Sequence, residues 1–236
     1  EIYNYKELRS ELRSLGYDFK SEGDTEVLLV GYQHFGKEIL NKLIGQFAFV
    51  IADYNKNYYF MARDRIGLKP LYYSISNQYF AFSSEFNSLN TSNLVSLSPN
   101  REAYVSYLRH LAIPNGSTGN ENIKKVQPGE FIVVDLEGKI TKELYWDPFD
   151  FTTEQDITSS EAIDRLDELL KSSVEYRKIS DVEVGLYLSG GLDSTLIGSL
   201  LATDTRIKSF NVDYDEIFDG YKGCLLYTSP SPRDKR

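Results

Sequence analysis

The chain of 236 residues is long enough for one large or two small domains, and its 41% hydrophobic content suffices for a core. No apolar run approaches the ~20 residues of a membrane span, no signal peptide is visible, and a net charge of −9 argues against broad binding to nucleic acid or anionic membranes. The only cysteine is Cys224, and an acidic chain so poor in thiols favours the cytoplasm.

The first third of the chain predicts helices followed by strands. Apolar residues at helical spacing predict helices over residues 5–15, 25–35 and 40–43, of which the last could continue the second. Apolar and aromatic segments separated by turns then predict two hairpins, 46–53 with 58–63 and 71–75 with 78–83. The many aromatic residues of these strands are expected in the core.

The remaining elements divide the chain into two predicted domains. We expect a helix over 102–111 and a late hairpin of 131–136 with 139–145. A polar and aromatic linker follows, and we place the domain boundary in it, with domains over residues 1–150 and 151–223. The second domain predicts a helix over 161–176 capped by Ser160, then a strand, a helix and a strand over 182–188, 194–201 and 207–212. Such a unit makes two parallel strands.

A glycine-rich turn lies between the strand and the helix of that unit. Its residues are Leu188, Ser189, Gly190, Gly191, Leu192, Asp193, Ser194 and Thr195. The two glycines let the backbone turn tightly and approach an anion, and the helix start aims free backbone N–H groups at it. The hydroxyl groups add further donors. A strand, a turn and a helix in this order therefore predict a phosphate-binding loop, with an ordinary turn as the alternative.

The carboxylate of Asp193 would repel a phosphate unless a cation lies between them. We therefore predict that Asp193 is a Mg²⁺ ligand. The loop lacks the lysine of a Walker A motif, and Ser-Gly-Gly-Leu-Asp-Ser resembles the pyrophosphate loop of the ATP pyrophosphatase family. The two histidines stand apart from any cluster of metal-binding residues, so a histidine metal site is not expected.

Several motifs along the chain come in a fixed order. They are Glu1-Ile2-Tyr3-Asn4, Gly23-Asp24-Thr25-Glu26-Val27, Gly45-Gln46-Phe47-Ala48-Phe49, Arg63-Asp64-Arg65-Ile66-Gly67-Leu68-Lys69-Pro70, Ser84-Glu85 and the glycine-rich turn. Together they resemble the glutamine-dependent asparagine synthetases of class B, from residue 1 to about Gly223. The resemblance implies an α+β domain followed by an α/β domain. The first is part of a four-layer αββα glutaminase domain with an N-terminal nucleophile, and the second is the start of a parallel-sheet ATP pyrophosphatase domain.

The resemblance also implies the reaction and the small molecules that the family uses. A glutaminase cysteine releases ammonia from glutamine, ATP adenylylates aspartate, and ammonia displaces AMP to give asparagine. Glutamine, aspartate and ATP are thus the expected substrates, and ATP and Mg²⁺ are the expected cofactors. The resemblance leaves open whether the protein forms a homodimer.

Individual site residues follow from matching the family motifs to this sequence. Glu1 and Asp24 match glutamine-binding positions, where Asp24 binds the α-amino group; from the residues alone, Asp24 would instead be a helix N-cap. Leu188 and Val212 match positions that contact adenine and ribose, and residues 189–195 match the ATP-binding loop. For Arg63 and Asp64 we favour a structural role, as an ion pair within a loop.

The sequence also departs from the family pattern. Glu1 matches the last residue of the family's Asn-Gly-Glu motif, so the nucleophilic cysteine segment is missing, and the synthetase domain stops after one strand–helix–strand unit. We expect a piece of a longer gene, inactive by itself. Residues 224–236 read like a translated sequencing adapter, and we expect a non-native tail there, with a genuine disordered tail as the alternative.

Two other functions share every feature present here. One is a related amidotransferase that amidates another carboxylate, such as a sugar acid or a peptide. The other is a non-catalytic fragment that at most binds a nucleotide. The aspartate pocket, which lies outside this sequence, would separate the first of these from an asparagine synthetase.

Overall fold

A computed structural model describes residues 1–114, 116–151, 157–180, 182–202 and 207–211 of the chain. The chain divides into two compact units, Glu1–Glu154 and Gln155–Arg236. Val212 and the whole tail 224–236 lie outside the described residues. None of the helices in the described ranges combines the length and the apolar character that a bilayer crossing needs.

The first unit is built from two antiparallel sheets. The larger has the order β1-β2-β6-β7, and its strands are Ala48–Asp53, Tyr58–Arg63, Glu130–Asp135 and Ile140–Leu144. The smaller has the order β4-β3-β5, and its strands are Phe80–Ser83, Tyr72–Ile75 and Lys124–Lys125. The predicted hairpins β1–β2, β3–β4 and β6–β7 are confirmed. The pairing of β2 with β6, in which Phe60 lies opposite Val133, joins the two distant hairpins into one sheet.

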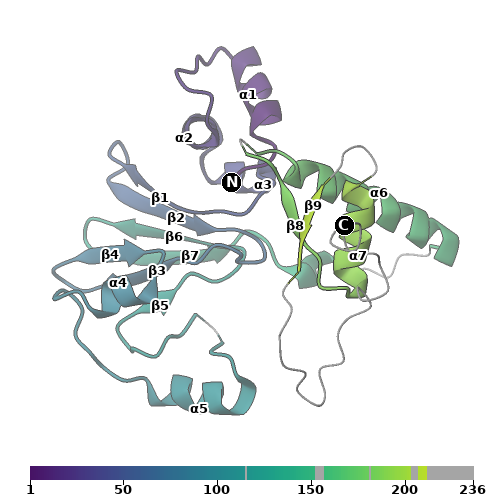
Figure 1. The fold of residues 1–236 in the computed structure, drawn as a ribbon. Coiled ribbons are helices and arrows are strands. Elements are labelled where there is room, and N and C mark those ends of the chain that lie inside the picture. Colours follow the sequence, from purple (N-terminus) through teal and green to yellow (C-terminus); the bar gives the residue numbers. More distant parts are fainter. Residues whose placement is uncertain (115, 152–156, 181, 203–206, 212–236) are drawn as a thin grey trace. The chain divides into compact units, whose positions relative to one another are not determined.

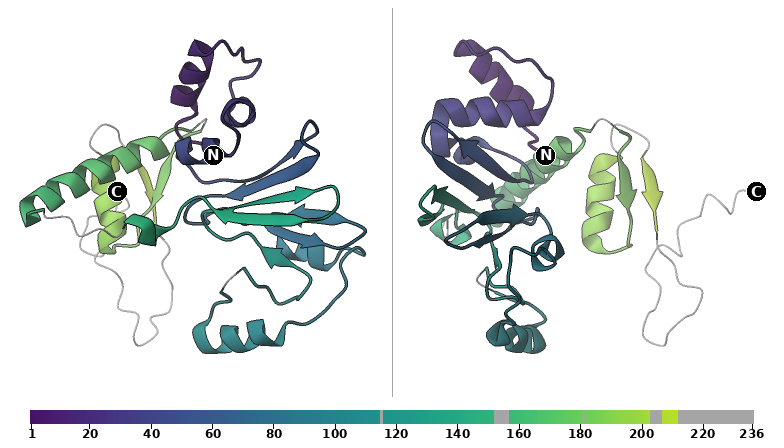
Figure 2. Two further views of the ribbon diagram at one scale, coloured as in Figure 1. Left: turned by 180° about the vertical axis from the view of Figure 1, so that it is seen from behind. Right: turned by 90° about the vertical axis from the view of Figure 1, so that its left-hand side faces the viewer.

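Helices cover the outer faces of both sheets (Figure 1). On the outer face of the larger sheet lie α1, α2, the 3-10 helix η1 and α3, which span Tyr5–Ser14, Asp24–Phe35, Gly36–Glu38 and Ile39–Lys42. On the side of the smaller sheet lie α4 and α5, Phe86–Asn90 and Arg101–His110. The views in Figure 2 agree with this order of layers. Residues 40–42 thus belong to a separate third helix with Leu43 as its C-cap, since η1 lies between α2 and α3.

Three buried clusters show why four layers form. Along β2, alternate side chains point to opposite faces: Phe60 joins the cluster under α1–α3, whereas Met61 joins the cluster between the two sheets. Phe131 and Ile132 of β6 divide in the same way. A third cluster, which includes Leu89 of α4, lies on the outer face of the smaller sheet. The αββα order predicted for this domain is therefore confirmed.

The second unit contains the predicted parallel strands. Its elements are α6, β8, α7 and β9, which span Ser159–Arg177, Gly185–Tyr187, Leu192–Leu201 and Lys208–Phe210. α7 connects β8 to β9, and the two strands pair with each other in parallel. Gly198 of α7 lies close to β8, because a Cβ added there would come within 2.9 Å of the Leu186 side chain. A short 3-10 helix η2, Pro148–Phe151, ends the described part of the first unit.

One predicted cap in this unit is wrong. Ser160 does not cap the helix, because α6 begins at Ser159 and its cap is Thr158. The Thr158 hydroxyl oxygen accepts a hydrogen bond from the Glu161 backbone N–H, and the Glu161 carboxylate accepts one from the Thr158 backbone N–H. This reciprocal pair requires a Glu or Gln three residues after the cap, and Ile163 stands at that position relative to Ser160.

Candidate functional site

The first candidate site lies where the beginning of the chain meets α2. The backbone N–H of Ile2 donates a 2.9 Å hydrogen bond to the carboxylate of Asp24, and the Glu1 nitrogen lies 4.0 Å from the same carboxylate oxygen. The side chain of Glu1 accepts a 3.0 Å hydrogen bond from Gln46. The structure therefore brings the two predicted glutamine-binding residues together.

Asp24 does not cap α2, so the N-cap prediction is wrong. Gly23 is the cap residue, in extended conformation, and Asp24 is already the first residue of the helix. Its carboxylate turns back to the chain start instead, with the Thr25 hydroxyl 3.4 Å away as a weak second donor. The side chain keeps 36% of its surface exposed, so it has room to accept hydrogen bonds from a ligand.

The chain start is held in place by an extended segment before β1. Ile2 and Gly45 form an antiparallel bridge, and the side chain of Asn4 bonds the backbone of both Lys42 and Ile44, at 2.8 and 2.9 Å. A Cβ on Gly45 would lie 2.2 Å from the carbonyl oxygen of Glu1. Only glycine allows the two backbones to approach so closely.

Sequence reasoning missed the buried arginine that fixes the loop before Asp24. Arg9 of α1 is 5% exposed; it forms an ion pair with Glu22 and donates a 3.0 Å hydrogen bond to the carbonyl of Gly23. Its guanidinium lies 5.5 Å from the ring centres of Tyr5 and Phe19. The spacing of Tyr5 and Arg9 on one helix face was the available signal, since residues four apart on a helix are neighbours.

Glu26 fixes the same loop from the other end. Its carboxylate accepts hydrogen bonds from the backbone N–H groups of Lys20 and Ser21, at 2.9 and 2.6 Å. These bonds hold the pKa of Glu26 below its ordinary value, and the bond from the Lys20 backbone has the largest effect. Arg9 and Glu26 thus position the turn that carries Asp24.

Arg63 and Asp64 bond backbone groups of the surrounding loops, as a structural role requires, but the predicted ion pair between their two side chains is wrong. Arg63 donates to the carbonyls of Lys69 and Val126 at 2.7 and 2.8 Å, and also to that of Gly67. Asp64, 1% exposed, accepts from the backbone N–H groups of Leu68 and Lys69. Backbone groups of the loop need these partners, so each side chain bonds the loop rather than the other. Burial lowers the pKa of Arg63.

The second candidate site is the turn between β8 and α7. Gly190 has a φ of +75°, a backbone conformation that favours glycine, and Gly191 precedes α7 without any side-chain cap. A Cβ on Gly191 would meet nothing closer than the Ser189 hydroxyl at 3.4 Å. The N–H groups at the start of α7 are therefore open to an anion.

The hydroxyl groups of this turn bond one another and the turn itself. Ser194 and Thr195 donate to the carbonyl of Gly191 at 3.1 and 2.8 Å, and the hydroxyls of Ser189 and Ser194 lie 3.0 Å apart. They would have to rotate to reach a phosphate. The N–H of Leu188 donates to the carbonyl of Phe210 at 2.8 Å, so this residue has only its carbonyl and side chain left for a nucleotide.

Asp193 lies in the first turn of α7 and is exposed, as is Leu192, which is 84% exposed. No hydrogen bond or ion pair of the Asp193 carboxylate occurs within the described residues. In the same ranges, no three His, Cys, Asp or Glu side chains gather into a metal-binding group. Within the described residues, the further ligands of a cation on Asp193 would thus come from the bound molecule or from water.

Two family models match the parts of the chain that contain the candidate sites. The glutamine amidotransferase domain model matches residues 1–146, and the asparagine synthase model matches residues 165–223. Asparagine synthetase [glutamine-hydrolyzing] 1 of Bacillus subtilis (strain 168) is 38% identical over 219 residues, covering 92% of this chain and 34% of that protein. Amidase chry2 of Gibberella zeae is 29% identical over 236 residues, covering 92% of this chain and 34% of that protein.

Among solved structures, the glutamine phosphoribosylpyrophosphate amidotransferase from B. subtilis gives a TM-score of 0.44 at 20% identity, over 89% of this chain and 43% of that one. The chain spans about a third of the length of the curated relatives it matches. Since the amidotransferase model covers residues 1–146 of 236, the chain belongs to the glutamine amidotransferase domain family, and an asparagine synthase match follows in the same chain.

Proposed function

We propose that the chain is part of a glutamine-hydrolysing asparagine synthetase. The observation that carries this proposal is the succession, in one chain, of an amidotransferase match over residues 1–146 and an asparagine synthase match over residues 165–223. In this function glutamine supplies ammonia, ATP activates the side-chain carboxylate of aspartate, and ammonia displaces AMP.

In the first unit, Asp24 binds the α-ammonium group of glutamine. Its carboxylate is partly exposed and already oriented by the Ile2 N–H group. A carboxylate held in this way can accept charge-assisted hydrogen bonds from an ammonium group, which are stronger than neutral ones. Glu1, whose side chain contacts Gln46, lies beside the same place and contributes to the glutamine pocket.

In the second unit, the turn 189–195 binds the phosphates of ATP. Its residues fit this group because the start of α7 is uncapped and Gly191 leaves the approach open. Bound ATP would supply the AMP group that is transferred to the aspartate carboxylate, with pyrophosphate as the leaving group. The chain's own part is to hold the phosphates through backbone N–H groups and the hydroxyls of Ser189, Ser194 and Thr195.

Asp193 is the proposed Mg²⁺ ligand at this turn. Its carboxylate is exposed and stands one residue beyond Leu192 at the helix start, where it would otherwise repel a phosphate. Oxygen ligands from one carboxylate, from phosphates and from water are a common set for Mg²⁺.

Leu188 and Val212 complete the proposed adenosine contacts, Leu188 through its carbonyl or side chain. We further propose that the enzyme is cytoplasmic.

The test is genetic complementation with the longer gene that contains this sequence. In an asparagine auxotroph, the gene should restore growth without added asparagine. Soluble protein without growth, or growth only with some other amide, would refute the proposal.

A second candidate is a related amidotransferase that acts on another carboxylate. This second candidate is supported by the alignment of 92% of this chain with a protein named Amidase chry2. Pyrophosphate release by the purified longer protein separates the two, because only an asparagine synthetase should require aspartate. A sugar acid or a peptide that supports release in its place would favour this second function.

A further inference from the structure

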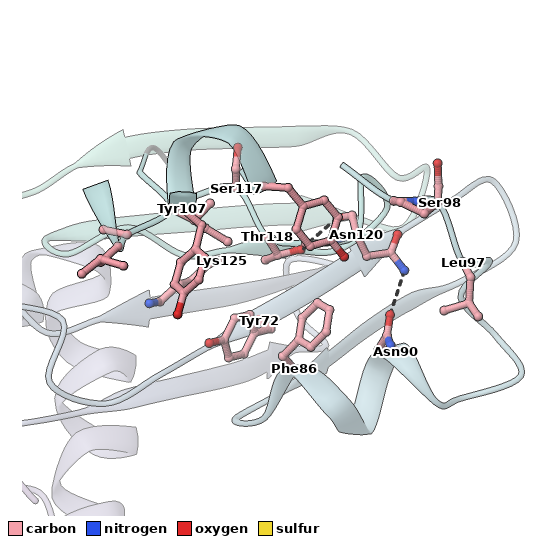
Figure 3. Close-up of a pocket in the computed structure, with 16 residues that line it drawn as sticks. Tyr72, Phe86, Asn90, Leu97, Ser98, Tyr107, Ser117, Thr118, Asn120 and Lys125 are labelled. Atoms are coloured by element: carbon pink, nitrogen blue, oxygen red, sulfur yellow. Dashed lines mark hydrogen bonds between the residues drawn. The ribbon is translucent and has the colours of Figure 1, made fainter. Parts of the chain in front are cut away.

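A cavity of about 630 Å³ lies on the outer side of the smaller sheet, between β3, β5, α4 and α5 (Figure 3). Its volume falls within the range of pockets that hold small molecules. Neither Glu1 nor Asp24, which belong to the same unit, contributes to its lining. Within the first unit, the cavity is therefore separate from the candidate site at the chain start.

Four aromatic side chains from three elements form much of the wall. Tyr72 of β3 and Phe86 of α4 meet edge to face, with ring centres 6.1 Å apart. Tyr104 and Tyr107 of α5 line the cavity while remaining 51% and 50% exposed. Flat rings that keep this much surface free are suited to contact a planar apolar molecule.

One basic side chain, Lys125 of β5, also lines the cavity. It is half-buried, and its ammonium lies 5.9 Å from the centre of the Tyr72 ring. Burial, and then the positive charge of Arg63, lower the pKa of Lys125. No carboxylate within the described residues forms an ion pair with it. A cation in partly apolar surroundings is costly without a counter-charge, so an anion here would be stabilised.

Two buried polar side chains of the wall, those of Thr118 and Asn120, already have partners. Asn120 donates to the side chain of Asn90 at 3.0 Å, and the Thr118 hydroxyl donates to the carbonyls of Asn120 and Ile123 at 2.9 and 2.7 Å. Thr118 and Asn120 are 5% and 3% exposed. These groups shape the cavity, and Lys125 is left to determine the charge of a ligand.

We propose that this cavity binds a small aromatic carboxylate. The ring of the ligand contacts Tyr107 and the other aromatic walls, and its carboxylate pairs with the ammonium of Lys125. This site is independent of the proposed glutamine and ATP chemistry.

The test compares two ligands of nearly equal shape, naphthalene-1-carboxylate and naphthalene-1-carboxamide, by isothermal titration calorimetry on the whole 236-residue chain. The carboxylate should bind about tenfold or more tightly, the scale of a hydrogen bond to a charged group. Lys125→Met keeps the aliphatic stem and should abolish this preference. Lys125→Arg should retain it.

Lys124→Met is the matched control, because Lys124 is the exposed neighbour on the same strand. It should leave the preference unchanged. Tyr107→Ala should weaken both ligands alike, and thermal unfolding of each variant reports whether the first unit stays folded. Equal affinity for the two ligands, a preference that survives Lys125→Met in folded protein, or no binding of either up to about 10 mM would overturn the proposal.

Discussion

The backbone N–H of Ile2 donates a 2.9 Å hydrogen bond to the carboxylate of Asp24, a residue 22 positions later in the chain. The bond orients one carboxylate oxygen and leaves the side chain 36% exposed. The chain start, the loop after α1 and the first turn of α2 are thereby joined at one place.

The first prediction concerns the charge of Asp24. In the longer enzyme, Asp24→Asn keeps an oxygen that can accept from Ile2 but removes the negative charge. We expect the KM for glutamine to rise about 10- to 100-fold, the scale of one charged hydrogen bond, while synthesis from free ammonia is unchanged. Steady-state kinetics with each nitrogen source measure both. Asp18→Asn, an exposed change before α2, is the control, and an unchanged glutamine KM in Asp24→Asn would refute the role.

The second prediction concerns the close backbone approach at Gly45. Gly45→Ala would place a Cβ 2.2 Å from the carbonyl oxygen of Glu1, so the bridge to Ile2 must open. We expect the free energy of unfolding to fall by roughly 1–3 kcal/mol, measured by urea unfolding. Gly23→Ala has nothing within 4 Å of the added Cβ and should lose only the smaller preference for glycine over alanine at a helix N-cap. Equal losses in both variants would contradict this account.

The third prediction concerns Glu26 and acid stability. Hydrogen bonds to the Lys20 and Ser21 backbone hold its pKa below the ordinary 4.5 in the folded protein. A lowered pKa means that its stabilisation is fully present above pH 4.5 and is lost as the pH falls through the folded value. The Glu26→Gln variant should therefore be less stable near neutral pH, and its unfolding should depend less on pH between about 5 and 3. Urea unfolding over this pH range measures the slope, with Glu7→Gln as a control on α1.

The fourth prediction concerns Asp193 in the longer enzyme. Asp193→Asn should leave glutamine hydrolysis intact and lower ATP-dependent pyrophosphate release on the order of 10²-fold or more, the scale of one electrostatic contact in an active site. Asp164→Asn on the exposed face of α6 is the control. Near-normal release with the same Mg²⁺ dependence would assign the metal to another residue.

The fifth prediction concerns the 236-residue chain itself. Its only thiol belongs to Cys224, in the tail that we expect to be non-native. The purified chain should release no glutamate from glutamine, because the proposed reaction needs a cysteine nucleophile. A glutaminase assay measures this. Glutamate release that Cys224→Ala abolishes would show the prediction to be wrong, and independent sequencing across residue 223 would test the origin of the tail.

The sequence predicted most helices and strands because their apolar periodicity is strong. Along β2, Phe60 and Met61 face different cores, and an apolar run without alternation is typical of such a strand buried on both faces. The assignment of the hairpins to two sheets was not predictable, since it depends on long-range pairings such as Phe60 with Val133. The strand Lys124–Lys125 was missed because it has two residues and no apolar side chain.

The site was predicted in part. The turn at Gly190 could be read from the sequence because few residues other than glycine adopt its backbone. The hydrogen-bond partner of Asp24 could not be predicted from the sequence, because the same side chain can serve as a helix N-cap or bond a distant backbone group. The buried position of Arg9 was missed as well, since a charged residue on an amphipathic helix is most simply assigned to the solvated face.

The pairing of β2 with β6 has a consequence for synthesis on the ribosome. The larger sheet places Phe60 opposite Val133, and β6 in turn pairs with β7, which ends at Leu144. While the chain emerges, β1 and β2 can pack under α1–α3 through Phe60, but the opposite face with Met61 stays uncovered until Tyr73 of β3 and Ile132 of β6 follow. The first unit should therefore fold only after Leu144 has left the exit tunnel, so that nascent chains released earlier would expose apolar strands to chaperones and proteases.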